Sequence, residues 1–249
     1  MDAVIKVGCC GTSGLSLQMY SKEFDLLEVQ RSFYELLKTD LANKWRNNVR
    51  LDFEFTMKVF QGITHPVESP TWRKYKKKIE GIDPNEVGLL RTTPFVKYCW
   101  EQSIEFAHVL KTKIVIIQLP PSLQYDTTGF GRLKTFFEFV EPDLTCAIEF
   151  RHESWIPHIS YILKNLRKWS IIVVSDPLKF NPPKQDVQYF RLHGMNGFTN
   201  YRYVYTDQEI DKLIIEAKKS NTYVLFNNIS MLTDAKRFLS KLHTVGFIE

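Results

Sequence analysis

Eight short runs with the residue pattern of β-strands alternate with segments of helical spacing along this chain. The strand-like runs cover residues 4–10, 26–32, 52–60, 113–119, 145–151, 170–176, 187–193 and 222–226. The expected helices cover residues 33–45, 94–110, 129–140, 157–168, 206–220 and 231–242. Strands that alternate with helices form parallel sheets, because parallel neighbours need a long crossover. Eight repeats within 249 residues predict an α/β fold, a closed (β/α)8 TIM-barrel-like parallel barrel, as one domain over residues 1–249.

Two runs show the two kinds of strand that such a barrel needs. In residues 52–60 apolar side chains occupy every second position from Phe53 to Val59, and Glu54, Thr56 and Lys58 stand between them. The run KIVIIQL at 113–119 is nearly continuously apolar, which suits a parallel strand buried on both faces. An open doubly wound sheet is the alternative, but it usually carries a glycine-rich fingerprint after its first strand, and GCCGTSG is a poor match.

The turn at residues 11–14, Gly-Thr-Ser-Gly, follows the first run and has two interpretations. Its small residues leave backbone amides that could hold an anion before a helix. The alternative is a tight strand-to-helix turn in which Ser13 caps the helix.

Composition places the chain among ordinary globular proteins with a sizeable core. It is 44% hydrophobic and 24% charged, with a formal net charge of +5. That small excess mildly favours anionic partners such as phosphates or nucleic acid, or serves solubility alone. The cysteines are Cys9, Cys10, Cys99 and Cys146, and none forms a CxxC pair. Reduced, buried thiols in a cytoplasmic protein are expected, and no apolar run reaches the roughly 18 residues of a membrane span.

Residues 61–112 are longer than a crossover requires, which predicts an insertion between the third and fourth strands. Insertions at strand ends often form lids or binding loops, and His65 at the start of this one could close over a substrate. The basic run at 72–78 is either a solvated helix face or a surface for an anionic backbone.

Polar side chains gather at the carboxyl end of nearly every predicted strand, where active sites of barrels lie. Among them Glu149 is expected to be the leading base and His193 a proton shuttle. Asp176 is a second acid or base, and Lys58 would offset developing charge. The predicted substrate-binding residues are Ser13, Glu28, Gln30, His65, Gln118, Arg151, His152, Trp155, Arg191, Asn227 and Asn228.

Within that set, Arg151 and Arg191 would clamp an anion, and Trp155 or the tyrosines of residues 201–205 would stack on a ring or sugar. A divalent metal held by Glu149, Asp176 and His193 is an alternative. The cations on the same rim oppose it, and the sequence requires no cofactor.

Short motifs in a fixed order cover almost the whole chain. They are GTSG at 11–14, LEVQRSFY at 27–34, Lys58 with Thr64 and His65, QLPPS at 118–122, EFRHESW at 149–155, SDP at 175–177, FRLHG at 190–194 and FNN at 226–228. In these motifs the chain resembles the DUF72, or YecE-like, family of uncharacterised proteins. The resemblance implies a TIM-barrel-like fold and implies no particular activity.

The residues support three hypotheses of function. The first is an enzyme that uses acid–base chemistry on a small anionic substrate, bearing phosphate or carboxylate, or on a sugar-like one. The second is a protein that binds or processes nucleic acid, in which residues 73–78 track the backbone. The third is a barrel that binds a ligand without catalysis. None of them involves a membrane.

Overall fold

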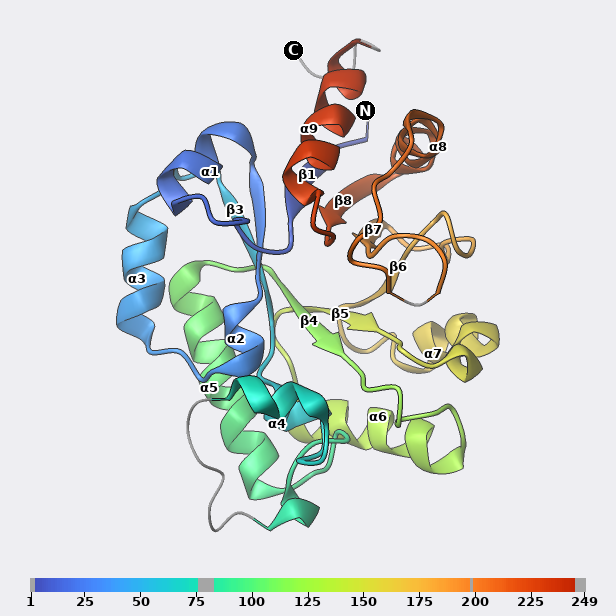
Figure 1. The fold of residues 1–249 in the computed structure, drawn as a ribbon. Helices are drawn as coiled ribbons and strands as arrows, with labels where there is room; N and C mark the ends of the chain where they lie inside the picture. The colour runs from blue at the N-terminus through green and yellow to red at the C-terminus, as the bar shows by residue number, and fades with distance from the viewer. Residues whose placement is uncertain (1–2, 76–82, 198, 245–249) are drawn as a thin grey trace. The chain divides into compact units, whose positions relative to one another are not determined.

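The computed structural model describes residues 3–75, 83–197 and 199–244. Within these ranges eight parallel strands pair in chain order, from β1 to β8, and close into a barrel. Figure 1 draws the strands as arrows. The strands are β1 (Ile5–Cys9), β2 (Leu26–Val29), β3 (Glu54–Lys58), β4 (Ile114–Gln118), β5 (Thr145–Glu149), β6 (Ile171–Ser175), β7 (Val187–Leu192) and β8 (Asn221–Phe226). The predicted fold class is confirmed.

Helices fill most of the connections between strands. The α-helices are α1 (Leu17–Glu23), α2 (Arg31–Tyr34), α3 (Thr39–Asn47), α4 (Gln61–Thr64), α5 (Pro94–Leu110), α6 (Thr127–Val140), α7 (Ile159–Asn165), α8 (Asp207–Ala217) and α9 (Met231–Thr244). The short 3₁₀ helices of the described residues are η1 (Pro70–Lys74), η2 (Pro84–Glu86) and η3 (Glu153–His158). The long helix of the insertion, α5, has the predicted bounds, with Thr93 as its cap and Pro94 in its first turn.

The second strand is shorter than predicted. It ends at Val29, because Gln30 has helical dihedral angles (φ −93°, ψ −28°) and is the N-cap residue of α2. Gln30 therefore does not face inward as a strand residue. The helix predicted over residues 33–45 is wrong in the same region, since α2 and α3 are separate helices with an irregular segment at 35–38 between them.

The turn after β1 does not place Ser13 as a helix cap, which was one of its two interpretations. Ser13 is exposed and adopts a left-handed conformation (φ 49°). Ser16 caps α1 instead, since its hydroxyl accepts a hydrogen bond from the amide of Met19 at 3.2 Å. Ser13 as a helix cap is therefore wrong.

The chain divides into two compact units. Unit 1 comprises Met1–Glu28, Asn48–Glu54 and Ile172–Glu249. Unit 2 comprises Val29–Asn47 and Phe55–Ile171. The single domain predicted over residues 1–249 stays a prediction.

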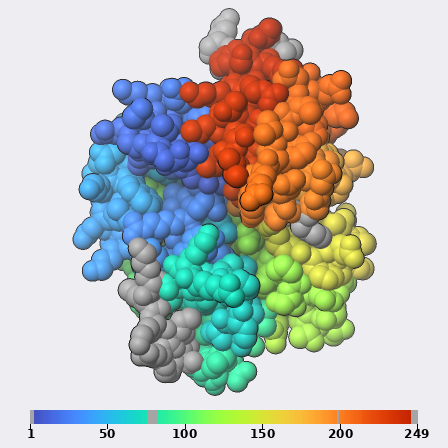
Figure 2. All heavy atoms as spheres, viewed as in Figure 1, coloured from blue at the N-terminus to red at the C-terminus, as the bar shows by residue number. Residues whose placement is uncertain are grey.

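Unit 1 is built on β8, which pairs with β1 on one side and with β7 on the other. Helices α8 and α9 lie side by side, in orange and red in Figures 1 and 2, and an ion pair joins Lys241 to Asp211 at 2.6 Å. Thr206 and Glu209 form a capping box that fixes the start of α8. In the same unit Lys6 on β1 forms an ion pair with Glu54 on β3.

Unit 2 is built on β4, which pairs with β3 and β5. The predicted alternation of β3 is confirmed. Phe55 and Met57 are buried on one face, and the guanidinium of Arg46 on α3 lies 5.2 Å from the Phe55 ring. Thr56 and Lys58 are buried on the other face.

All four cysteines are free thiols in buried positions, as predicted. Burial raises the pKa of the Cys9 thiol to about 12, which suits a structural and unreactive side chain. None of the helices in the described ranges is long and apolar enough to cross a membrane.

Candidate functional site

Unit 2 presents polar side chains at the carboxyl ends of three neighbouring strands. The register of β4 and β5 places Gln118 directly beside Glu149. The register of β3 and β4 places Lys58 beside Ile116, two residues before Gln118. Because residues paired in a parallel sheet share a face, these three side chains lie on the same face of the sheet. The structure thus brings together Lys58, Gln118 and Glu149 as predicted.

Arg151 joins this group from the segment that follows β5. Its guanidinium forms an ion pair with Glu149 at 2.9 Å and donates a hydrogen bond to the amide oxygen of Gln118 at 3.3 Å. Both charged side chains are largely buried, which strengthens their attraction but also makes each charge costly without the other. The pair is held in place by two adjacent strands.

Lys58 is positioned by the one-turn helix α2. Its ammonium group lies 3.6 Å from the centre of the Phe33 ring, a close cation–π contact in a buried setting. The hydroxyl of Ser32 donates to the backbone carbonyl of Lys58 at 2.7 Å, which fixes α2 against the end of β3. Because β2 ends at Val29, the residues that follow it form α2, and this helix supports Lys58.

His65 lies in the same environment as these charges. Its pKa is lowered from 6.5 to about 3, chiefly because the ring is buried and further because Lys58 and Arg151 disfavour a third cation. Glu149 acts in the opposite direction, so all three charged side chains lie within electrostatic reach of the imidazole. The ring is therefore neutral near pH 7, and its Nδ1 shares a hydrogen bond with the Thr64 hydroxyl at 2.8 Å.

The insertion holds His65 through its backbone. The indole of Trp72 donates to the His65 carbonyl at 3.3 Å. Gly88 approaches that carbonyl so closely that a Cβ at this position would lie 2.3 Å from its oxygen. The amides of Gly88, Leu89 and Leu90 donate to carbonyls within α4. The insertion thus places His65 beside the strand ends.

Two other predicted residues of unit 2 have structural contacts. The Nδ1 atom of His152 accepts a hydrogen bond from the amide of Ser154 at 3.2 Å and caps η3. Trp155 is 0% exposed, donates to the carbonyl of Leu123 and stacks on Phe150. Its enclosed ring leaves no face for a ligand, which corrects the expectation that Trp155 stacks on one.

The basic run is only partly described. Trp72 is buried, and the ammonium of Lys74 lies 4.9 Å from the ring of Tyr34. Lys76, Lys77 and Lys78 lie outside the described residues. A role for this run in nucleic-acid binding stays a prediction.

Unit 1 has a different polar cluster. Arg191 on β7 donates to Glu28 on β2 at 2.8 Å, and the hydroxyl of Tyr189 donates to the other Glu28 oxygen at 2.9 Å. The side chains of Arg191 and Glu28 are 1% and 0% exposed. A buried arginine balanced in this way costs several kcal/mol to separate from its carboxylate. The predicted role of Arg191 as an anion clamp stays a prediction.

Two titratable groups lie at the ends of β6 and β7. His193 donates from Nδ1 to the carbonyl of Arg191 at 3.1 Å, which fixes the proton on that nitrogen in the neutral ring. Burial raises the pKa of Asp176 to about 6, and Lys179 at 3.6 Å opposes the shift. Asp176 therefore titrates close to neutral pH, as a general acid or base requires.

The remaining predicted residues of unit 1, Asn228, Asn227 and Ser13, differ in how deeply they are buried. Asn228 donates from Nδ2 to the Tyr203 carbonyl and to Asp234 of α9, both at 2.7 Å. These bonds fasten the loop before α8 to α9, whereas the buried Oδ1 of Asn228 has no hydrogen-bond partner in the described part of the chain. Asn227 follows the end of β8 and is half-buried, and Ser13 is exposed. A single mouth shared by all the predicted residues stays a prediction.

Three residues of these clusters were not predicted. Tyr189 shares its strand face with Arg191, so the period of two could have found it. Phe33 carries no sequence signal, because a ring beneath a lysine depends on tertiary contacts. Gln61 is fully buried, and in the described part of the chain neither its amide oxygen nor its nitrogen has a hydrogen-bond partner. Unsatisfied buried amides are rare in proteins.

The metal alternative has no geometric support among the described residues. Across residues 3–75, 83–197 and 199–244, no group of three or more His, Cys, Asp or Glu side chains is arranged to hold a metal ion.

Known proteins resemble this chain over nearly its whole length. UPF0759 protein YunF of Bacillus subtilis (strain 168) is 26% identical in an alignment of 244 positions, which covers 86% of this chain and 80% of that protein. A DUF72 family protein from Enterococcus faecalis V583 is 21% identical, with a TM-score of 0.72 over 98% of both chains. D-psicose 3-epimerase from Clostridium cellulolyticum H10, solved with D-tagatose, is 11% identical, with a TM-score of 0.55 over 98% of this chain and 99% of that one.

At these identities the solved structures show a shared fold and no more. The model of a family described as "Protein of unknown function DUF72" matches residues 10–246. Because that match includes the strand ends of both units, the resemblance seen in the motifs is confirmed, and the chain belongs to the DUF72 family.

Proposed function

We propose that this protein is an enzyme that performs acid–base chemistry on a small sugar-like or anionic substrate at the carboxyl ends of β3, β4 and β5. One observation carries the proposal. The buried Glu149–Arg151 ion pair lies within electrostatic reach of Lys58 and of a His65 that is neutral at physiological pH. Charged groups this deeply buried are costly for a merely structural role, and such clusters mark functional sites.

Each side chain has a distinct task in this proposal. The carboxylate of Glu149 removes a proton from a carbon next to a carbonyl, and the electron pair of the broken C–H bond moves to the carbonyl oxygen. Lys58 and Arg151 stabilise the negative charge that develops on that oxygen. Neutral His65 donates or accepts a hydrogen bond without adding a third cation to the cluster. Return of a proton to the opposite face of the same carbon gives the epimer. Return to the neighbouring carbon, with the hydroxyl proton passing between the two oxygens of the enediolate, gives the isomer.

A sugar-like substrate is compatible with the fold and with the polar groups of the site. A sugar presents several hydroxyl groups, and Gln118 has an amide that can accept and donate beside Glu149. D-psicose 3-epimerase shares the barrel with this chain, so the fold accommodates sugar chemistry of this kind. The support from that protein is one of fold alone, because its identity with this chain is 11%.

Thermal denaturation with a ligand panel tests the proposal. The panel contains ketohexoses, hexose phosphates, hydroxycarboxylates and inorganic phosphate, so that its arms separate a sugar from an anion. We expect at least one organic member to raise the Tm of the wild-type protein in a concentration-dependent way. Glu149→Gln should lose that rise, and Glu138→Gln, at an exposed site on α6, should keep it. A panel without effect, or an equal rise in Glu149→Gln, would contradict the proposal.

A further inference from the structure

One crossover of the barrel lacks a helix. In the described part of the chain, every other pair of consecutive strands is joined through at least one α-helix, whereas residues 176–186 between β6 and β7 contain none. The β6–β7 ladder is also short, with register pairs at Val174 and Ser175 only, against six pairs between β7 and β8. The β6–β7 connection therefore lacks the helix found at this place in a regular (β/α)8 barrel, and the loop 176–186 packs near β7 instead, where Gln188 bonds to Pro183.

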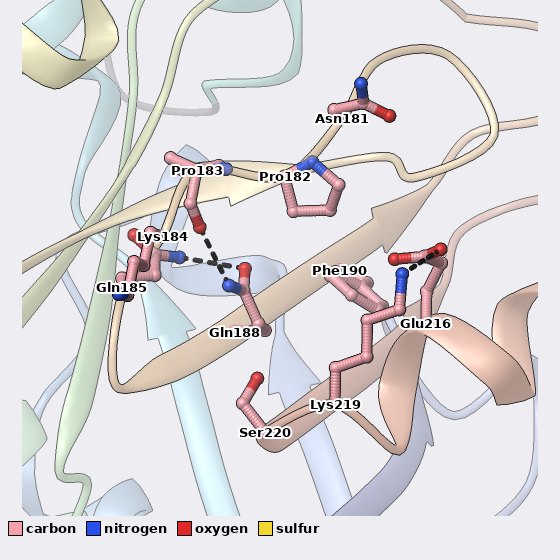
Figure 3. Close-up of a pocket in the computed structure, with 10 residues that line it drawn as sticks. All are labelled: Asn181, Pro182, Pro183, Lys184, Gln185, Gln188, Phe190, Glu216, Lys219 and Ser220. Carbon is pink, nitrogen blue, oxygen red and sulfur yellow. Dashed lines mark hydrogen bonds and ion pairs between the residues drawn. The ribbon is translucent and has the colours of Figure 1, made fainter.

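A pocket of about 430 Å³ occupies this place in unit 1 (Figure 3). Pro182, Pro183 and Phe190 form apolar parts of its lining. Gln188 of β7 and Ser220, just before β8, add polar groups. Gln188 and Ser220 belong to the amino-terminal parts of the strands, so the pocket is distinct from the strand ends that carry Asp176 and His193.

The walls of the pocket are fixed by side-chain amides. Gln185 accepts from the amide of Val173 and donates to its carbonyl, both at 2.9 Å, so its side chain takes the place of a neighbouring strand. Gln188 donates to the carbonyl of Pro183 at 2.9 Å. The two prolines restrict the backbone of the same loop. A lining held in this way binds a ligand without a large cost of ordering.

The side chains that line the pocket carry a net positive charge. Lys219 is paired with Glu216 at 2.6 Å, as the dashed line in Figure 3 shows. Lys184 is exposed and has no ion-pair partner among the residues that the structure describes. The lining therefore carries two lysines against one glutamate. The Ser220 hydroxyl is a further hydrogen-bonding group on the same lining.

The volume of the pocket favours a small molecule over a peptide helix as its occupant. Pockets for small molecules commonly measure roughly 300–1,000 Å³, and this one falls in the lower part of that range. A helix about 10 Å in diameter and several turns long could not enter it. Pro182 and Pro183 suit a flat or branched apolar body, and Lys184 suits one negative charge.

We propose that this pocket binds a small monoanion with an apolar body, of the class of aromatic or branched aliphatic carboxylates. The apolar body lies against the half-buried Pro182 and Pro183, and the carboxylate meets Lys184 with help from Ser220. This second site is independent of the function proposed at β3–β5.

Titration of the full-length protein with benzoate, followed by amide chemical shifts, tests this site. We expect saturable shifts concentrated in residues 181–190 and 216–220. Benzamide, the neutral counterpart, and acetate, which lacks the ring, should bind more weakly. Lys184→Gln should weaken benzoate binding about two- to fivefold, as expected for one exposed charge pair. Lys22→Gln, at an exposed lysine on α1, should leave it unchanged.

A second variant blocks the pocket itself. Ser220→Phe should abolish the shifts by filling the space, and Lys184→Gln keeps the proposal testable if that variant does not fold. Scattered or non-saturating shifts would overturn the proposal. Equal binding of benzamide and benzoate, or benzoate binding that Lys184→Gln does not change, would overturn the anionic part of it.

Discussion

The Glu149–Arg151 ion pair shows how one residue determines the character of the unit 2 site. Glu149→Gln keeps the shape of the side chain but leaves the Arg151 charge buried without its carboxylate. We expect a loss of about 3 kcal/mol in the free energy of unfolding, since removing one partner of a buried pair is strongly destabilising. Urea denaturation at pH 7 measures the change.

A matched variant separates this effect from the loss of any glutamate charge. Glu138 on α6 lies 4.0 Å from Lys134, and both side chains are about half exposed. Glu138→Gln should change stability by less than about 0.5 kcal/mol, because exposed pairs contribute little. Equal losses in the two variants would show that Glu149 is an ordinary surface charge.

His65 gives a prediction with a definite sign. Its pKa is about 3 in the folded protein against 6.5 for an ordinary histidine, so between these values the unfolded chain binds more protons. Stability should therefore rise as the pH increases from about 3 to 6.5, and this contribution should be constant above 6.5. His65→Gln should remove it. An imidazole that titrates near 6.5 in the NMR spectrum of the folded protein would contradict the buried, neutral ring.

Asp176 gives the opposite dependence of folding stability on pH. Its pKa is about 6 in the folded protein against 3.8 for an ordinary aspartate, so the folded state holds the proton more tightly in that interval. Stability should fall as the pH rises from about 3.8 to 6 and remain lower above it. Asp176→Asn keeps an oxygen that can accept from the Leu178 amide and should stabilise the protein at pH 7 by about 2 kcal/mol. Stability curves of the two proteins that stay parallel across this interval would refute the assignment.

At the scale of elements, α4 and the segment that follows η2 form one structural group. Gly88, Leu89 and Leu90 all have positive φ angles between 53° and 71°. Such a conformation is costly for leucine and persists only where other contacts enforce it. Here three backbone hydrogen bonds to α4 do so. The strained turn therefore holds α4, and with it His65.

Two glycine substitutions test that grouping. Gly88→Ala would place a Cβ 2.3 Å from the His65 carbonyl oxygen, so we expect a loss of more than about 2 kcal/mol and a changed environment of the His65 ring. Gly131→Ala, within α6 and with open space around it, should instead stabilise by about 0.5–1 kcal/mol. Thermal unfolding and the His65 NMR signals measure both effects. A neutral Gly88→Ala would show that the turn does not hold α4.

Element boundaries show where sequence reasoning succeeds and where it stops. Alternation predicted β3, and Pro94 with helical spacing predicted α5, because both signals are local. Residues 26–32 also alternate, yet the strand ends at Val29. Ser32 instead donates to the Lys58 carbonyl, a contact between segments 26 residues apart that no local pattern contains.

At the scale of the whole molecule, the sequence predicts which residues are chemically important more reliably than it predicts their partners. The period of two, with the rule that barrel sites lie at strand ends, was sufficient to group Lys58, Gln118 and Glu149. It could not show that Arg191 is enclosed with Glu28, because both residues have the same parity and polarity as exposed site residues. Burial and pairing arise from packing, which only coordinates contain.

The eight-strand barrel and the membership of this chain in the DUF72 family are established. The decisive question is whether the side chains around Glu149 and Arg151 in unit 2 transfer protons to and from a substrate. Transfer of solvent deuterium to carbon in ketohexoses and hexose phosphates, followed by NMR, measures this directly. We predict exchange at a carbon next to the carbonyl that requires the wild-type Glu149 and persists in Glu138→Gln. A panel member that binds but never exchanges, or exchange that is equally fast in Glu149→Gln, would contradict acid–base catalysis at this site.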